Sequence, residues 1–318
     1  MFGSRRGLAA VFIGVALFGA GCGGRDFARR SGTPEPAAAL RRAPTPVPVA
    51  HDPRLQAALL HSVTLTSAVH TARTSISVTV TGLGDAALAT GAFNIAGTGV
   101  VDFGNGNTDL SLSIPLFDRL GGGGVVEQRV VGGVMYTKLP AEVLRFAGMP
   151  ASVRWVSLDP QKVGADLSAL SQAQADPAGQ LAFLAAISTD VRRVGVASVR
   201  GVVTTHYAAT IDLGADDRSG RNVAAAGAKL AQFGTVIGTR RLAVDVWIDG
   251  SRRARRVVVS VPLSVESGAA AIKGLGSDAT MRIQSDYFSF GAPVRVAAPP
   301  HAQVRPYDAL GLDVAGGG

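Results

Sequence analysis

The chain has 318 residues, a formal net charge of +8 and an aromatic content of only 6%. Its arginines are scattered along the sequence, apart from the run RRARR at 252–256. Proteins that bind nucleic acids present a basic stripe together with aromatic side chains that stack on bases, so this composition argues against a nucleic-acid partner.

The first 21 residues have the layout of a secretory signal. Arg5 and Arg6 precede an apolar run at residues 8–18, which is shorter than the roughly 20 residues that a membrane-spanning helix needs. Small residues at 19–21 then lead to Cys22, the only cysteine of the chain. This arrangement resembles the lipobox of bacterial lipoproteins, although Gly19 stands where a lipobox usually has leucine. The alternative is a plain signal peptide with an incidental cysteine.

The lipobox interpretation divides the chain into four parts. We expect a lipoprotein signal peptide at 1–21, followed at 22–54 by the lipidated Cys22 and a disordered tether rich in Pro, Ala and Arg. One folded domain at 55–295 and a flexible tail at 296–318 complete the chain. Acyl chains such as palmitate on Cys22 would hold the protein on the extracytoplasmic face of the cell membrane.

The folded domain opens with a predicted helix and continues with strands. Residues 53–72 place apolar side chains near helical spacing. From residue 74 the apolar period changes to two, as in TSISVTVTG, where Ile76, Val78 and Val80 share one face. GNGN at 104–107 is typical of a hairpin turn. The same alternation continues in the segments 91–103, 109–115, 125–140 and 153–159.

The second half of the domain repeats this pattern with two helical interruptions. Leucines at helical spacing predict two short helices within 166–190, and an Ala-rich segment predicts another at 224–238. Alternating strands resume in the segments 196–213, 240–250, 254–266 and 280–290.

These patterns predict an α+β fold that is mainly antiparallel β. About 10 or 11 strands joined by short links would form a strongly curved sheet, a half-barrel, with a few short helices covering its concave face. The concave face would be rich in Val, Ile and Leu. Two outcomes remain open at this point, an apolar cavity beneath the helices or a fully packed core.

No catalytic pattern stands out in the sequence. The five histidines lack the spacing of a metal site, and no GxSxG nucleophile motif is present. Asp245 and Asp249 flank Trp247 on one strand face, and a carboxylate pair could serve acid–base chemistry. We interpret them instead as exposed strand residues that pair with the arginines of 252–256. The prediction is a protein that is not an enzyme and that uses neither metal nor cofactor.

Several strand segments resemble the LppX/LprAFG family of lipoproteins, which have the LolA-like fold. They are GTGVVDF (97–103), EQRVVGGVMYTKLP (127–140), RWVSLD (154–159), RGVVTTHYAATIDL (200–213) and VWIDGSRRARRVVVS (246–260). The resemblance implies a curved antiparallel sheet closed by helices around a hydrophobic cavity. It also implies binding of a lipid or lipoglycan and its carriage in the cell envelope, with an envelope transporter as a further partner.

If such a cavity exists, we expect apolar side chains of the first strands and of the helical insert to line it. The predicted wall residues are Val78, Val80, Phe93, Ile95, Leu110, Leu112, Leu167, Leu170, Leu181 and Leu184. The alternative function is that of an envelope lipoprotein with a solid core, which acts through its surface as a binding or scaffolding module without lipid cargo.

Overall fold

The computed structural model describes residues 52–83, 94–115, 124–159, 188–212, 239, 241–262 and 275–310. The signal, Cys22 and most of the tether lie outside these residues, as does the predicted helix at 224–238. Of the predicted helical insert at 166–190, residues 166–187 also lie outside the described residues. Residues 188–190 are described, and they begin a strand. None of the described helices is both long and apolar enough to cross a membrane.

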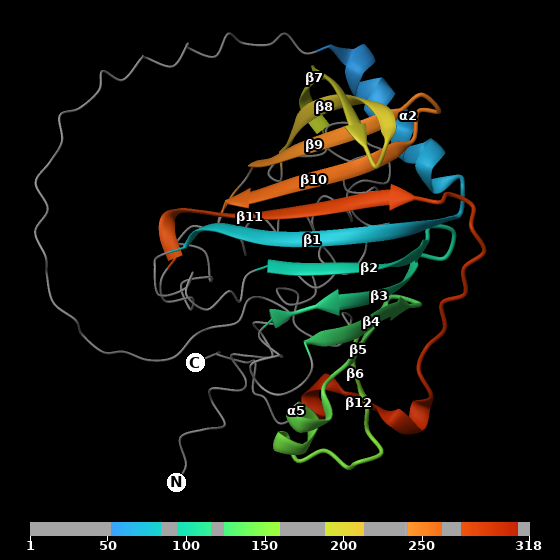
Figure 1. The fold of residues 1–318 in the computed structure, drawn as a ribbon, viewed down its shortest axis with the longest axis vertical. Coiled ribbons are helices and arrows are strands. Elements are labelled where there is room, and N and C mark those ends of the chain that lie inside the picture. Colours follow the sequence, from blue (N-terminus) through green and yellow to red (C-terminus); the bar gives the residue numbers. More distant parts are fainter. Residues whose placement is uncertain are drawn as a thin grey trace, which may run out of the picture.

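The described strands form one large curved sheet that does not close on itself (Figure 1). Its order is β12-β6-β5-β4-β3-β2-β1-β11-β10-β9-β8-β7, so β12 and β7 are the two edges. All neighbouring strands are antiparallel except the parallel pair β12 and β6. The strands are β1 Thr71–Leu83, β2 Asn94–Asp102, β3 Asn107–Ser113, β4 Val125–Val131, β5 Val134–Lys138, β6 Trp155–Leu158, β7 Ser188–Val199, β8 Val202–Asp212, β9 Arg241–Asp249, β10 Ala254–Pro262, β11 Leu275–Phe288 and β12 Val304–Pro306. The predicted half-barrel is confirmed.

One face of this sheet, here called the inner face, carries the buried apolar side chains. In β1 the residues Ile76, Val78 and Val80 are all buried on it, as their alternation predicts. Val78 lies opposite Ile283 of β11 on one side and opposite Ile95 of β2 on the other. The inner-face side chains of β1, β11, β10, β9 and β8 form one main core cluster.

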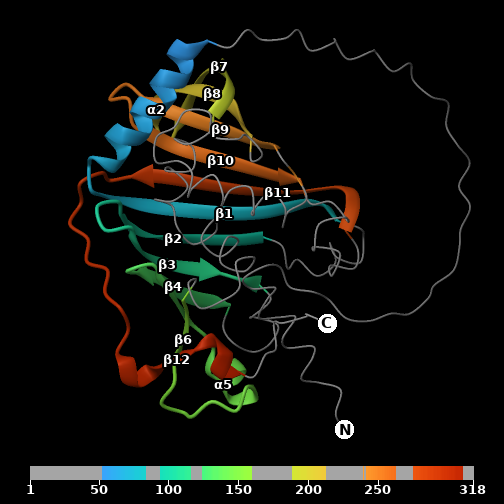
Figure 2. The same cartoon turned by 180° about the vertical axis from the view of Figure 1, so that it is seen from behind.

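Two described helices pack onto the two ends of the inner face (Figure 2). Helix α2, Pro53–Ser67, begins at Asp52, whose side chain accepts a hydrogen bond from the backbone N–H of Arg54 at 2.9 Å. Its residues Leu59 and Val63 belong to the main core cluster. Helix α5, Ala141–Phe146, packs at the opposite end of the sheet and is a helix that the sequence patterns did not predict.

The segment after β11 differs from the expected flexible tail at 296–318. The chain crosses to the far edge of the sheet, where the short helix η2, His301–Gln303, precedes β12. Strand β12 then pairs with β6, and helix η3, Tyr307–Leu310, follows. Parallel pairing satisfies backbone groups that a loose tail would leave to water, so the described residues 296–310 are part of the fold.

Candidate functional site

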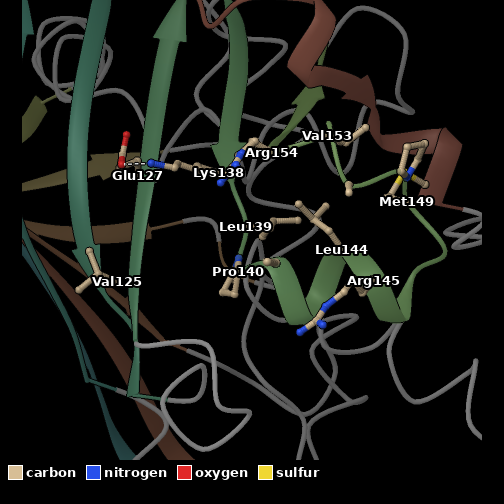
Figure 3. A pocket seen from close by; sticks show the side chains of 13 residues that line it. Val125, Glu127, Lys138, Leu139, Pro140, Leu144, Arg145, Met149, Val153 and Arg154 are labelled. Carbon is tan, nitrogen blue, oxygen red and sulfur yellow. Dashed lines mark hydrogen bonds and ion pairs between the residues drawn. The ribbon is translucent and has the colours of Figure 1, made fainter.

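A pocket of about 330 Å³ lies between helix α5 and the ends of β4 and β5 (Figure 3). This volume is at the lower end of the range of about 300–1,000 Å³ that is usual for small-molecule sites. Apolar side chains make most of its wall, and charged side chains stand among them. The lining residues are Val125, Glu127, Lys138, Leu139, Pro140, Ala141, Leu144, Arg145, Met149, Pro150, Ala151, Val153 and Arg154.

The local sequence explains why the chain folds back to form this wall. Pro140 follows β5 and, with φ −54° and ψ 142°, occupies the N-cap position of α5. The helix has Glu142 in its first turn and Arg145 in its last, where each charge interacts favourably with the helix dipole. Gly148 adopts a positive φ of 75°, and the N–H of Met149 then bonds to the carbonyl of Leu144 at 2.9 Å. The chain reverses at this turn, and Met149, Pro150, Ala151 and Val153 then line the pocket.

Three apolar residues of the pocket wall, Leu139, Leu144 and Val153, belong to a second buried cluster, here called the α5 cluster. Leu139 and Leu144 point toward each other in it (Figure 3). Two half-buried side chains, Ile95 and Leu112, pack against both the α5 cluster and the main core cluster. The two apolar clusters are therefore in contact through these two side chains. The α5 cluster comprises Ile114, Val126, Leu139, Val143, Leu144, Val153 and Val156.

Three cations stand at the pocket and differ in their partners. Lys138 pairs with Glu127 on the neighbouring strand, and Arg145 pairs with Glu142 at 3.1 Å. Arg154 is exposed, and its guanidinium forms no ion pair with any described residue. Counted over the described residues, the pocket therefore has a surplus of positive charge that a negatively charged group could neutralise.

From Glu127 in the pocket lining, a charged network extends over the outer face of β3 and β4. Arg129 pairs with Asp109 at 3.0 Å and with Glu127 at 3.7 Å, and its guanidinium stacks over Trp155 at 4.8 Å. Burial raises the pKa of the Asp109 carboxyl, an effect that Arg129 opposes and Glu127 reinforces. Glu127 is thus shared between Arg129 and Lys138.

Tyr307 of η3 packs against the α5 cluster from the other side. Burial raises the pKa of its hydroxyl. Among the described residues this hydroxyl is a buried polar group without a hydrogen-bond partner. An unsatisfied hydroxyl beside an apolar cluster is a candidate partner for a polar group of a ligand.

The carboxylates singled out in the sequence do not form a pair. Asp249 is buried and bonds to Arg255 at 2.6 Å, so its predicted arginine partner is confirmed, but the expectation that it is exposed is wrong. Asp245 bonds instead to the Nε2 atom of His206 at 2.7 Å, and the His206 ring stacks on Trp247 with centroids 4.1 Å apart. The two carboxylates therefore have separate partners and do not form the carboxylate pair considered above.

Within the ranges that the structure describes, no group of three or more His, Cys, Asp or Glu side chains is placed to hold a metal ion.

The structure describes five of the ten predicted wall residues and places all five on the inner face. Val78, Val80 and Leu110 are buried in the main core cluster, whereas Ile95 and Leu112 link it to the α5 cluster. None of these five lines the pocket itself, so their role as a cavity wall stays a prediction. The positions outside the described residues are Cys22, Phe93, Leu167, Leu170, Leu181 and Leu184.

Sequence reasoning missed the pocket because its residues come from a short helix and two turns. The available signal was the sequence KLPAEVLRFAGMP at 138–150, in which Pro140 precedes the helix and Gly148 ends it. Only six residues lie in α5, too few to show a helical period.

Comparison with known proteins gives matches among solved structures only. No family model matches the chain, and no curated protein sequence matches it significantly. The lipoprotein LppX of Mycobacterium tuberculosis is 19% identical, with a TM-score of 0.43, and the match covers 77% of this chain and all of LppX. For LprF of Mycobacterium bovis the identity is 17% and the TM-score 0.41, with coverage of 78% and 98%.

A more distant match is a domain from Vibrio parahaemolyticus described as an outer membrane lipoprotein-sorting protein. It is 7% identical with a TM-score of 0.24, and the match covers 74% of this chain and 92% of that domain. The solved structures similar to this chain thus include LppX and LprF, lipoproteins of the family that its strand segments resemble.

Proposed function

We propose that the chain is an exported, membrane-anchored lipoprotein that binds a lipid or lipoglycan and carries it in the cell envelope. One observation carries this proposal. Leu139, Leu144 and Val153 of the pocket under α5 belong to an apolar cluster that packs through Ile95 and Leu112 against the main core of the half-barrel. An acyl chain that entered from the pocket would lie among these apolar side chains, and each CH₂ group removed from water contributes about 0.8 kcal/mol.

The charged side chains at the pocket provide for the polar part of such a ligand. Arg154 has no ion-pair partner among the described residues, and Lys138 lies beside it in the lining. A phosphate or carboxylate accepts strong charge-assisted hydrogen bonds from groups of this kind. The ligand class that we propose is therefore an amphiphile with an acidic head group, whose acyl chain extends toward Leu112.

The location follows from the N-terminal sequence. The signal layout of residues 1–21 and the lipobox-like Cys22 favour attachment to the cell membrane on its extracytoplasmic face. A tether at 22–54 would let the domain move between the membrane and a partner such as an envelope transporter.

A second candidate function is favoured by the close burial of the predicted wall. Leu110 is 1% exposed and Val80 6% exposed, as in an ordinary packed core. A solid core would make the protein a surface binding or scaffolding module at the envelope. The two functions differ in whether the protein takes up an acyl chain.

Calorimetric titration of the full chain carrying Cys22→Ser separates them. We expect binding of lysophosphatidylglycerol, and at least tenfold weaker binding after Ala151→Trp, which fills the pocket from an exposed position. The matched control is Ala243→Trp on an exposed position of β9, which should bind as the parent does. Absence of binding by the parent protein would favour the solid-core module.

A second pair of variants tests the head-group preference. Arg154→Gln should weaken binding of lysophosphatidylglycerol and leave the weaker binding of uncharged monoacylglycerol unchanged. Arg282→Gln removes the same charge from an exposed position of β11 and should change neither. Equal loss in both variants would show that Arg154 has no specific role.

A further inference from the structure

At the end of the sheet where β11 finishes, arginines gather around two phenylalanines. Phe288 is the last residue of β11, and Phe290 follows it. Arginines of the β7–β8 turn and the β9–β10 turn contact these two rings. This set of residues is here called the arginine end: Arg73, Arg200, Arg252, Arg253, Arg255, Phe288 and Phe290. In the sheet order these residues lie on or beside β1 and β7–β11. The pocket lies at β4 and β5, in the other half of the sheet.

Three of the five guanidinium groups of the arginine end are held against aromatic rings. Arg200 lies 4.0 Å over the centroid of Phe288. Arg253 and Arg255 lie 5.5 Å and 4.7 Å from the centroid of Phe290. Stacking restricts long side chains that would otherwise be free, so less conformational entropy is lost when they bind a partner.

Most of this charge is not neutralised by the residues that the structure describes. Arg255 is paired with the buried Asp249, and the nearby Arg256 donates two hydrogen bonds to Asp286 at 2.6 and 2.7 Å. The remaining arginines of the set form no ion pair with the described residues. They are Arg73, Arg200, Arg252 and Arg253.

Two of these arginines occupy backbone positions that favour other residues. Arg200 has φ 51° and is followed by Gly201 with φ 81°, the conformation of a two-residue hairpin turn in which Asn-Gly is preferred. Arg252 has φ 59° in the β9–β10 turn. A bulky residue in the left-handed region is strained, and the side chains of both arginines are exposed.

We propose that the arginine end docks on an anionic bilayer surface. Exposed basic side chains are attracted to anionic leaflets, and the guanidinium is more weakly hydrated than an ammonium group. The predicted anchor favours a membrane over other polyanions, because the tether predicted at 22–54 would have a reach of roughly 30 Å and would keep the domain close to the leaflet. The docked domain would hold its β7–β11 half toward the lipid head groups.

The test uses the full chain with Cys22→Ser and vesicles that are sedimented with bound protein. One set of vesicles contains phosphatidylcholine alone, and the other contains equal parts of phosphatidylcholine and phosphatidylglycerol. The protein with an unchanged arginine end should bind preferentially to the vesicles that contain phosphatidylglycerol, and added salt should weaken this binding. The variant Arg200→Gln/Arg252→Gln/Arg253→Gln should bind at least tenfold more weakly.

The matched control, Arg192→Gln/Arg241→Gln/Arg282→Gln, loses the same charge from exposed positions outside the arginine end. We expect its binding to the vesicles that contain phosphatidylglycerol to weaken less than threefold. Circular dichroism of both variants verifies that they fold. Equal losses in the two variants, binding by the first variant that matches the parent, or equal binding to both kinds of vesicle would each overturn the proposal.

Discussion

The side chain of Thr66 in helix α2 accepts a hydrogen bond from the backbone N–H of Ala254 in β10, with Oγ1 and N 2.8 Å apart. The same hydroxyl donates to the carbonyl of Ser62 at 2.6 Å, and Thr66 is fully buried. Ala254 begins its strand after the β9–β10 turn. One threonine therefore joins the helix to the sheet at the end of α2.

Replacing this hydroxyl should destabilise the fold. In Thr66→Val the buried N–H of Ala254 loses its acceptor, so we expect the free energy of unfolding to fall by about 1–3 kcal/mol. Thr66→Ser keeps the hydroxyl and should recover most of this loss. The exposed Thr64, whose hydroxyl bonds only to Leu60 in the described structure, provides the control Thr64→Val. Urea denaturation measures the free energy of unfolding of all three variants. A free energy for Thr66→Val within about 0.5 kcal/mol of the parent's would contradict the role given to this bond.

Gly99 in β2 permits a close approach of β3. A Cβ atom at this position would overlap the backbone oxygen of Asp109 and lie 2.9 Å from the Cα atom of Leu110. Because backbone atoms cannot rotate away, Gly99→Ala should cost about 1–3 kcal/mol. Gly195 in β7 has no atom within 4 Å of the corresponding position, so Gly195→Ala should be within about 0.5 kcal/mol of the parent. Equal effects of the two substitutions in urea denaturation would argue against this packing.

The raised pKa of Asp109 predicts a pH dependence. Burial, the largest cause, makes the charged carboxylate less favourable in the folded state than in the unfolded chain. This penalty is present above the folded-state pKa and disappears below the unfolded value near 3.8. Asp109→Asn removes the charge at every pH. The free energy of unfolding of the variant, relative to the parent, should therefore be higher at neutral pH than near pH 3. A relative stability that is lower at neutral pH would show that the pairing with Arg129 outweighs burial, and an unchanged one would show that the two effects cancel.

Cys22 is expected to carry the anchor. Cys22→Ala should move the protein from the membrane fraction to the soluble fraction after a wash at about 1 M salt, which screens attraction between the arginine end and the lipids. Ser31→Ala, in the same tether, should stay in the membrane fraction. Immunoblots of the two fractions measure the distribution. Persistence of Cys22→Ala in the salt-washed membranes would remove the lipobox interpretation.

The alternating faces of the strands could be predicted from the sequence because burial in an antiparallel sheet follows a period of two. The residues Leu242, Val244 and Val246 of β9 are buried as their spacing requires. Partners across strands could not be predicted in the same way. The bond between His206 and Asp245 depends on the register of β8 and β9, in which His206 lies opposite Trp247, and no local pattern sets that register.

Short elements were missed for a related reason. Strand β12 has three residues and forms only because β6 offers an edge, so its own sequence carries no strand pattern. Helix α5 is stabilised by burial of Val143 and Leu144 rather than by its length. Since the pocket is built from α5 and its flanking turns, most of the candidate site depends on tertiary contacts.

Native mass spectrometry of the full chain, purified from salt-washed membranes and released from its detergent, tests the central proposal most directly. We predict a protein mass that carries a noncovalently bound acyl lipid, which is lost on denaturation and reduced in amount in Ala151→Trp but not in Ala243→Trp. A protein that is recovered without any lipid, and that takes none up from added lysophosphatidylglycerol, would contradict lipid carriage.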